Sequence, residues 1–281
     1  MAAHEESRRR AERGAYGLRF SGLTGVEKLL VPGDRTWPGL EVIAERGPIE
    51  GFRNEVDEER ATLLLLGAVA IVERSSGRAV FRFETDPDPQ ALVHPYLAPV
   101  AGLLAYWHGR ESFHAGAFVA AGGAWGLFAE REGGKSSTLA RLAFEGVPVV
   151  SDDVLVVEGG TAFAGPRAID LRREAARALG AGEPLGVLGT RERWRVTLDE
   201  CDGAFPLRGW VFLAWGDEVS LTGVPAGSRL RRLAAERAIR LAPRDPSVLL
   251  SLAALPAFEL RRPHEWSSLE DATKLLLSSL R

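Results

Sequence analysis

Residues 124–144, AWGLFAEREGGKSSTLARLAF, contain the pattern that decides the fold of this chain. An apolar run, a charged loop with two glycines and a segment with helical apolar spacing follow one another. This order predicts a strand that ends near Ala129, a loop from Glu130 to Gly134 and a helix from Lys135 to Phe144. A strand, a glycine-containing turn and a helix that begins at a lysine are the parts of a P-loop, whose backbone N–H groups cradle phosphates.

The P-loop interpretation assigns roles to the loop and to the first turn of the helix. Lys135 is expected to neutralise the β- and γ-phosphates of a nucleotide, and the Ser136 hydroxyl to ligate Mg²⁺. Only three of the 35 lysines and arginines are lysines, so a lysine at this position is not a routine surface cation. We therefore expect ATP and Mg²⁺ as cofactors. The candidate nucleotide-binding residues are Glu132, Gly133, Gly134, Lys135, Ser136 and Ser137.

The loop departs from the pattern G-x-x-x-x-G-K-[ST] at its first position, where this chain has Ala129. Alanine leaves a strand readily at negative φ, but it does not follow a turn that requires positive φ. Glu130, Arg131 and Glu132 are also unusual beside a polyphosphate, although side chains can point away from a cradle made of backbone. The alternative is an ordinary helix N-terminus with a solvated Lys135.

An acidic pair follows the next apolar run. Asp152 and Asp153 come directly after residues 147–150, 17 and 18 positions beyond Lys135. We predict a short buried strand that lies beside the P-loop strand, so that its carboxyl end reaches the γ-phosphate. One carboxylate can hold Mg²⁺ while the other accepts a hydroxyl proton. The alternative is a turn that begins the following hairpin.

Turn signals and periodicity outline the rest of the chain. Hairpins are expected around Gly122-Gly123 and Gly159-Gly160. Further strands are predicted at residues 16–23, 40–44, 62–67, 68–73, 78–84, 194–198, 209–215, 219–224 and 257–261, and further helices at 94–107, 228–240, 247–255 and 267–280. The mixture predicts a three-layer α/β core with a mixed sheet over residues 91–281, preceded by a small β-rich lobe over residues 1–90.

The region around the loop resembles a known family. The run His114-Ala115-Gly116, the segment EREGGKSSTLARLAFEG and the segment VPVVSDDVLVV together resemble the catalytic domain of HPr kinase/phosphorylase. Residues 165–172, GPRAIDLR, are similar to HPr-kinase-related proteins that include kinases of peptide natural-product pathways. The resemblance covers about residues 105–265 and implies a P-loop kinase core of the HPr kinase and phosphoenolpyruvate carboxykinase type.

The resemblance also implies residue roles and an activity. Asp152 would be the general base, Asp153 a metal ligand, His114 a neighbour of the nucleotide or the acidic pair, and Arg167 a neighbour of the transferred phosphate. The implied reaction is transfer of the ATP γ-phosphate to a Ser or Thr hydroxyl of a peptide or small protein. A small-metabolite kinase and a nucleotide-binding accessory protein without turnover are the alternatives. The N-terminal lobe would serve as an acceptor platform or form a homo-oligomer.

Composition excludes other classes. A net charge of −3 argues against a nucleic-acid partner. The longest apolar run, residues 61–72, is shorter than the roughly 20 residues that span a bilayer, so no membrane partner is expected. The single Cys201 and a charged N-terminal segment without an apolar signal core indicate a cytoplasmic protein.

Two residue types remain open to more than one interpretation. Arg191, Arg193 and Arg195 alternate as on the solvent-facing edge of a strand, and a second phosphate clamp formed by them is the alternative. The seven tryptophans are expected in the core and at the lobe interface rather than against a ligand.

Overall fold

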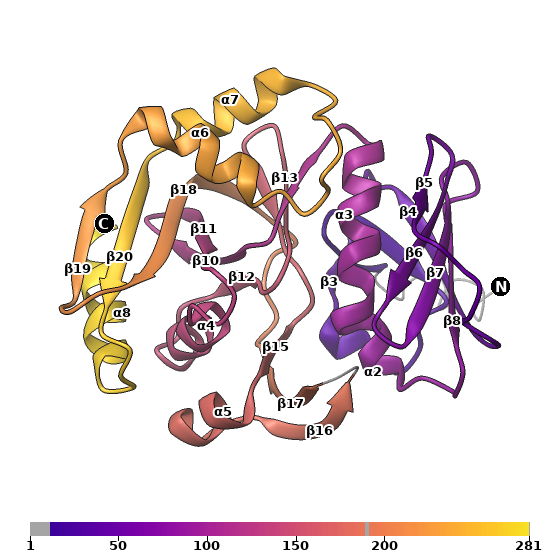
Figure 1. Ribbon diagram of the computed structural model, residues 1–281, viewed down its shortest axis with the longest axis horizontal. Coiled ribbons are helices and arrows are strands. Elements are labelled where there is room, and N and C mark those ends of the chain that lie inside the picture. Colours follow the sequence, from indigo (N-terminus) through magenta and orange to yellow (C-terminus); the bar gives the residue numbers. More distant parts are fainter. Residues whose placement is uncertain (1–11, 189–190, 281) are drawn as a thin grey trace, which may run out of the picture.

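Three β-sheets and the helices around them make up residues 12–188 and 191–280, the part of the chain that the computed structural model describes. An N-terminal sheet and a central sheet lie on either side of α3 (Leu97–Trp107), drawn in magenta in Figure 1. Two short elements, α2 (Pro89–Ala91) and η2 (Leu92–Tyr96), lead into α3. The helix predicted over residues 94–107 is regular only from Leu97, because His94 has extended backbone angles. The chain is thus a mixed α/β protein.

The N-terminal sheet has eight strands, and a turn shortens one predicted strand at its start. Its strands in spatial order are β3 (Val31–Pro32), β1 (Arg13–Ala15), β2 (Leu18–Ser21), β4 (Gly39–Arg46), β8 (Arg78–Phe83), β7 (Ala68–Glu73), β6 (Arg60–Leu65) and β5 (Glu55–Val56). Tyr16 and Gly17 have φ values of 59° and 71° and form a two-residue turn between β1 and β2. The strand predicted over residues 16–23 is confirmed as the shorter β2, because Tyr16 and Gly17 belong to the preceding turn. The other four predicted strands of this region are also confirmed, β7 with the predicted ends and three with shifted ends.

The central sheet has nine strands and carries the predicted hairpins. Its main order is β12 (Val149–Ser151), β10 (Gly116–Ala120), β11 (Gly123–Phe128), β18 (Ala204–Trp215), β14 (Thr161–Phe163), β13 (Leu155–Glu158) and β9 (Glu111–Phe113), with β20 (Ala257–Arg262) and β19 (Ser220–Gly223) continuing from β18. Both predicted hairpins are present: β13–β14 turns at Gly159 and Gly160 as expected, whereas β10–β11 turns one residue earlier than expected, at Ala121 and Gly122. The strands β11, β18 and β20 are parallel, so their carboxyl ends share one edge of the sheet.

One predicted neighbour relation is wrong. The strand β12 pairs with β10, and β10 in turn pairs with β11, so β12 lies one strand away from β11. The hairpin partner β10 occupies the place that the sequence interpretation gave to β12. Because both pairings are antiparallel, β12 still runs in the direction of β11 and ends at the same edge.

Helices cover both faces of the central sheet. They are α4 (Lys135–Phe144), α6 (Ala226–Ala235), α7 (Pro246–Ala254) and α8 (Ser268–Ser279). Leu127 and Val211 share a hydrophobic cluster with residues of α4 and α8. The next residues along the same strands, Phe128 and Phe212, share the other cluster with residues of α6 and α7. This alternation, which follows the two-residue period of a strand, gives the predicted three layers.

A third, small sheet extends from the central layers beside α5 (Arg173–Leu179). It consists of β15 (Ala168–Leu171), β17 (Arg191–Thr197) and β16 (Glu183–Leu188). The sequence predicted a strand at residues 194–198, which overlaps β17, but neither β15 nor β16 nor α5. In Figure 1 this sheet lies below α4 and next to the start of α3.

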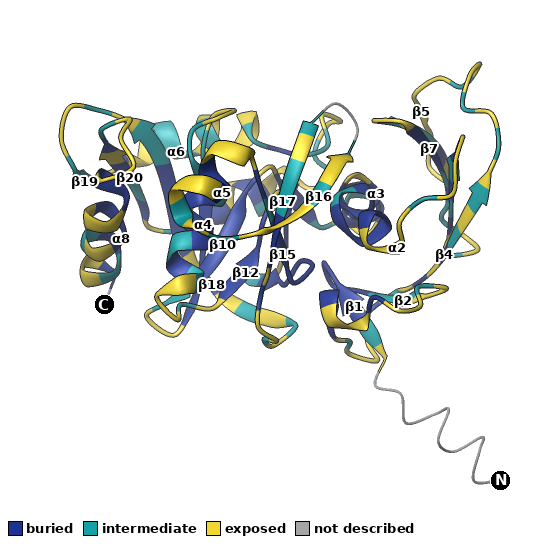
Figure 2. Ribbon diagram, turned by 90° about the horizontal axis from the view of Figure 1, so that it is seen from below, coloured by how far each residue is buried: buried dark blue, intermediate teal, exposed yellow. Residues whose placement is uncertain are grey.

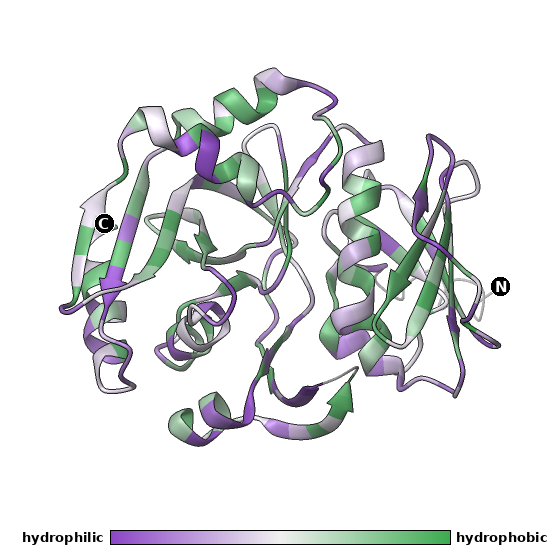
Figure 3. Ribbon diagram, in the orientation of Figure 1, coloured by the Kyte–Doolittle hydropathy of each residue, from purple (hydrophilic) through white to green (hydrophobic). Residues whose placement is uncertain are grey.

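The hydrophobic core crosses the boundary at residue 90. Phe81 of the N-terminal sheet, Leu97 of α3 and Trp210 of β18 belong to one cluster of buried residues. Figure 2 shows α3 almost wholly buried, and Figure 3 shows the hydrophobic residues of α3 and of the strands that face it. The division into a lobe of residues 1–90 and a domain of residues 91–281 stays a prediction. In residues 12–188 and 191–280, no helix is long and apolar enough to cross a membrane.

Tryptophan burial agrees with the expectation at some positions only. Trp107 and Trp210 are buried, and so are Trp37 and Trp125. Trp215, by contrast, is 38% exposed and Trp266 is 46% exposed. The expectation that all seven lie in the core or at the lobe interface is therefore wrong for these two.

Candidate active site

The loop between β11 and α4, residues 129–134, is here named the glycine loop. Glu132 and Gly134 have positive φ values, 69° and 85°, whereas Ala129 is not among the described residues with positive φ. A Cβ atom on Gly133 would lie 2.9 Å from the Glu130 carbonyl oxygen, so glycine is required there. No side chain caps the N-terminus of α4. The first N–H groups of the helix therefore have no side-chain acceptor, which suits an anion.

The first hydroxyl after the lysine contacts the acidic pair. The Ser136 hydroxyl donates to the Asp152 carboxylate, with 3.1 Å to each of its two oxygens. The Lys135 ammonium lies 3.9 Å from Asp153 Oδ1 and donates to the Asp153 carbonyl oxygen at 3.4 Å. Two pairs of residues that are 16 and 18 positions apart thus meet at the sheet edge where β11 and β12 both end.

The two carboxylates differ in environment. Asp152 is only 4% exposed, and burial raises the pKa of its carboxyl group against the opposing effect of Lys135. The Asp153 side chain is 52% exposed. Desolvation raises the pKa of Asp153, but Lys135 and weaker nearby cationic groups outweigh it, so that this pKa is lowered overall. The buried carboxylate faces Ser136 and the exposed one lies beside Lys135 at the surface.

The other loop candidates occupy varied positions. Glu132 points toward Arg172, with an ion pair of 3.0 Å. Ser137 is buried in the first turn of α4. His114 is exposed and lies close enough to Asp153 and Lys135 for both to affect its pKa, which desolvation lowers. The role beside the nucleotide or the acidic pair that the resemblance implied for His114 stays a prediction.

Arg167 lies away from this cluster. The residue is 2% exposed, and its guanidinium donates to the carbonyl oxygens of Asp199, at 2.9 Å, and Val150, at 3.5 Å. Burial lowers its pKa, and Cys201 and Asp199 oppose that shift. A buried guanidinium that is bonded to backbone carbonyls stabilises the fold. Its position does not support the contact with a transferred phosphate that the resemblance implied.

Contrary to the expectation, the three arginines of β17 (Arg191, Arg193 and Arg195) do not all face solvent. Arg195 is 4% exposed and makes a two-pronged ion pair with Asp170, at 2.8 and 3.0 Å. The same guanidinium donates to the His94 carbonyl oxygen at 2.7 Å. Arg195 thus ties β17 to the start of α3, and the prediction of a solvent-facing edge is wrong at this position.

Two buried polar groups near the acidic pair were missed at the sequence level. The Tyr16 hydroxyl and His94 Nδ1 have no hydrogen-bond partner among the described residues, and these residues are 1% and 2% exposed. Burial raises the pKa of the Tyr16 phenol well above its ordinary value, and Asp153 and Asp152 add to that shift. Tyr16 comes from the turn between β1 and β2, so the N-terminal sheet contributes a side chain to the surroundings of the acidic pair.

The residues present fit a nucleotide with its metal ion. An uncapped helix N-terminus, a lysine and a hydroxyl–carboxylate pair match the donors that hold phosphates and Mg²⁺ in P-loop proteins. No group of three or more His, Cys, Asp or Glu side chains that could hold a metal occurs in the described ranges. Mg²⁺ in nucleotide sites takes one or two protein ligands and completes its shell with phosphates and water.

Comparisons with known proteins give a resemblance at the level of the fold. No family model matches the sequence, and no curated protein matches it. Among solved structures 63 chains match, and one of these is the HPr(Ser) kinase/phosphatase from Coxiella burnetii. The chain is similar to that protein with 15% sequence identity and a TM-score of 0.30 over 60% of this chain and 97% of that chain. This is a weak and distant likeness at the level of the fold.

Proposed function

We propose that this chain is an ATP- and Mg²⁺-dependent kinase that transfers the γ-phosphate to a Ser or Thr hydroxyl of a peptide or small protein. The observation that carries the proposal is the contact between Ser136 and Asp152 directly behind the glycine loop. In P-loop enzymes the hydroxyl after the loop lysine and a carboxylate at a strand end hold Mg²⁺ together. Lys135, one residue before that hydroxyl, lies at the same edge.

The glycine loop, Lys135 and Ser136 are the residues that would hold the phosphates and the metal ion. When bound, Mg²⁺ neutralises charge on the β- and γ-phosphates. The free N–H groups at the start of α4 and the Lys135 ammonium lower the energy of a polyphosphate on the loop. The Glu132 carboxylate makes an ion pair with Arg172, which neutralises its charge beside the loop.

The geometry suggests a division of labour within the acidic pair. Asp152 is buried and bonded to Ser136, which suits a metal partner of that hydroxyl. Asp153 is half-exposed and lies beside Lys135 and His114, which suits a group that orients an incoming hydroxyl and accepts its proton. We propose these roles, which are the reverse of those that the resemblance implied.

The proposed acceptor is a peptide because, among the described residues, the N-terminal sheet has an unpaired edge at each end. Its edge strands are β3 and β5, and an extended peptide can add to such an edge. Leu64 and Leu66, on and just after the neighbouring β6, are 45% and 51% exposed and offer apolar contacts near β5. A homo-oligomer formed through the same edge is the competing use of this surface.

Transfer of labelled γ-phosphate from ATP tests the proposal directly. The acceptors are peptides encoded beside the gene and free serine, and Lys135→Ala is the inactive control. Because the Lys135 side chain contributes charge rather than core packing, this variant should keep the fold and lose Mg·ATP binding. Unchanged calorimetric affinity in the variant would exclude the phosphate site. Equal labelling of free serine would favour a metabolite kinase, and tight ATP binding without any consumption would favour an accessory protein.

A further inference from the structure

A surface hollow of about 520 Å³ lies at the carboxyl ends of β18 and β20. It is lined by Trp215, Gly216, Asp217, Pro263, His264 and Glu265. Cavities of this size take small ligands. None of these six residues has a role in the phosphate site described above, so that site does not account for the hollow.

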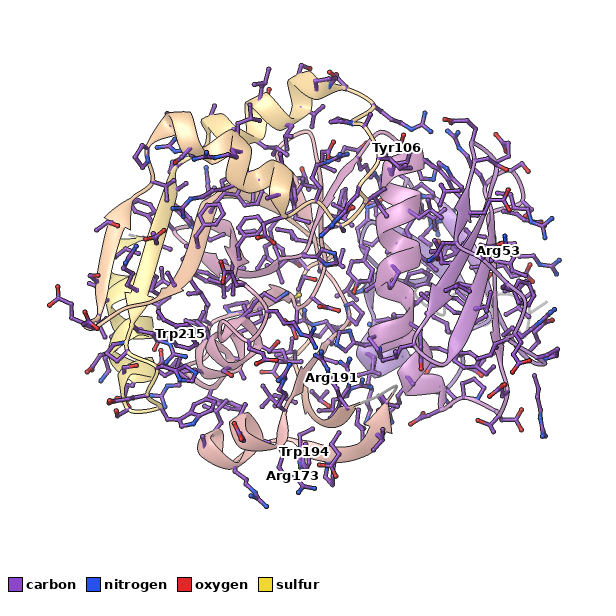
Figure 4. All side chains as sticks on the ribbon, viewed as in Figure 1. Arg53, Tyr106, Arg173, Arg191, Trp194 and Trp215 are labelled. Carbon is purple, nitrogen blue, oxygen red and sulfur yellow. The ribbon has the colours of Figure 1, made fainter. Side chains whose placement is uncertain are left out.

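Trp215 provides a preformed aromatic surface in the hollow. Its side chain is 38% exposed, and in Figure 4 it lies between the end of β18 and α4. The Arg262 guanidinium carbon lies 4.5 Å from the indole centroid, and the His264 ring centroid lies 4.4 Å away at an interplanar angle of 79°. Two neighbours therefore fix the orientation of an indole that remains open to solvent.

Trp215 and Arg262 also lie against the glycine loop. A Cβ atom on Gly134 would lie 3.4 Å from Trp215 Cη2 and 2.9 Å from Arg262 Nη2. Arg262 is 5% exposed, and its Nη1 donates to the carbonyl oxygens of Pro263 and Glu265. No carboxylate lies within ion-pair distance of Arg262 in the described part of the chain. The hollow is thus continuous with the place where phosphates would lie, and a buried cation without a carboxylate partner borders it.

Strand order determines which way a nucleotide would point. The strand β11 has antiparallel β10 and then β12 on one side, and parallel β18 and then β20 on the other. Ligands of open α/β sheets bind beyond the carboxyl ends of strands, where the connections diverge. The acidic pair follows β12 and Trp215 ends β18. A nucleotide on the loop would therefore direct its transferable phosphate toward the acidic pair and its base toward Trp215.

We propose that Trp215, His264 and Arg262 form the platform for the adenine base of the nucleotide whose phosphates lie on the glycine loop. This inference rests on the proposed function. The base packs against the indole, and the carboxylates of Asp217 and Glu265 at the wall of the hollow accept hydrogen bonds from its amino group. Stacking of a base on an aromatic side chain contributes on the order of tenfold or more in affinity.

The test compares two ligands in three variants by calorimetric titration. The ligands are Mg·ATP and Mg·tripolyphosphate, which has the phosphates without the base. Trp215→Ala should weaken ATP binding on the order of tenfold, about 1.4 kcal/mol, and leave tripolyphosphate binding within about twofold. Trp215→Phe should retain most of the ATP affinity. Trp266→Ala removes an exposed tryptophan that does not line the hollow and should change neither affinity.

The outcomes separate this inference from the proposed function. If the unmodified chain binds neither ligand, the phosphate site and the platform both fail. If it binds tripolyphosphate as tightly as ATP, the phosphate site stands and the platform is refuted. An equal loss of both ligands in Trp215→Ala, with unchanged circular dichroism, would also refute the platform, because Trp215 would then act on the loop and not on the base.

Discussion

Replacement of Tyr16 by phenylalanine removes one oxygen atom that has no hydrogen-bond partner in the described protein. The residue is 1% exposed, and its phenol lies within the field of Asp153 and Asp152. A merely structural tyrosine at such a position would be expected to have a bonded hydroxyl. We therefore predict that the hydroxyl acts in the reaction, as a donor to the acidic pair or to the groups that it holds.

Tyr16→Phe is expected to affect stability and turnover differently. An unpartnered buried hydroxyl costs about 1–3 kcal/mol, so Tyr16→Phe should leave the free energy of unfolding unchanged or raise it. A hydrogen bond to a charged group contributes about 1.5–3 kcal/mol, so its loss in the transition state should lower kcat about 10- to 150-fold. Denaturant unfolding and ATP turnover at saturating Mg²⁺ measure the two quantities on the same preparation.

Tyr96 provides the matched control. Its hydroxyl donates to the Leu66 carbonyl oxygen at 2.8 Å, so Tyr96→Phe breaks an existing bond. This variant should lose about 1 kcal/mol of stability and keep its kcat. If Tyr16→Phe instead loses stability and keeps its kcat, the hydroxyl is structural and the assignment of Tyr16 to the site is wrong.

Three further changes test the site and the fold. Asp152→Asn should weaken the dependence of turnover on Mg²⁺. Asp153→Asn should keep that dependence and lose about 10²-fold or more in kcat. Identical Mg²⁺ titrations of the two variants would show that the pair acts as one coupled acid site. Ala129→Gly should leave the Kd for ATP within about tenfold, because Ala129 is not among the described residues with positive φ, and a larger calorimetric change would contradict this. A chain that begins at His94 should not fold, because it exposes the buried face of α3, and cooperative thermal unfolding of that chain would show that residues 94–281 form an independent domain.

Local signals in the sequence were sufficient for the strand, loop and helix around Lys135. The apolar run, the two glycines and the helical spacing all lie within residues 124–144, so no distant contact was needed to predict β11 and α4. The paired glycines at residues 122–123 likewise predicted the hairpin β10–β11. The predicted position of β12 beside β11 was wrong because local signals do not suffice there. The tertiary fold decides which strand inserts between two others, and no local pattern reports it.

The surroundings of the acidic pair were less accessible to prediction. Tyr16 and Lys135 are 119 residues apart, and nothing near Tyr16 except its turn with Gly17 marks it. Arg167 and Arg195 look like surface arginines in a chain with many of them, yet both are buried. Their burial depends on carbonyl oxygens and on Asp170, partners that only the folded chain supplies.

Trp215 was misjudged because exposure is not visible in a strand pattern. The residue ends an apolar strand in which Trp210 is fully buried, and the two look alike in sequence. The two tryptophans differ in exposure because of their positions along β18. Trp210 faces α6 and α7 in the core, whereas Trp215 lies at the carboxyl end of β18, beyond the part of the strand that helices cover. The carboxyl ends of parallel strands are where ligands of open α/β sheets bind, so exposure of a side chain there is not anomalous.

The N-terminal sheet lies closer to the acidic pair than a separate, peripheral lobe would. The turn between β1 and β2 carries Tyr16 to the acidic pair, and the Tyr16 N–H donates to the Ala164 carbonyl oxygen at 2.6 Å. On the far side, Arg195 fixes His94, at the start of α3, to Asp170 and β17. Both links place buried polar groups around one carboxylate pair. A platform for peptides or a contact between copies would therefore use a sheet that also contributes Tyr16 to the surroundings of the acidic pair.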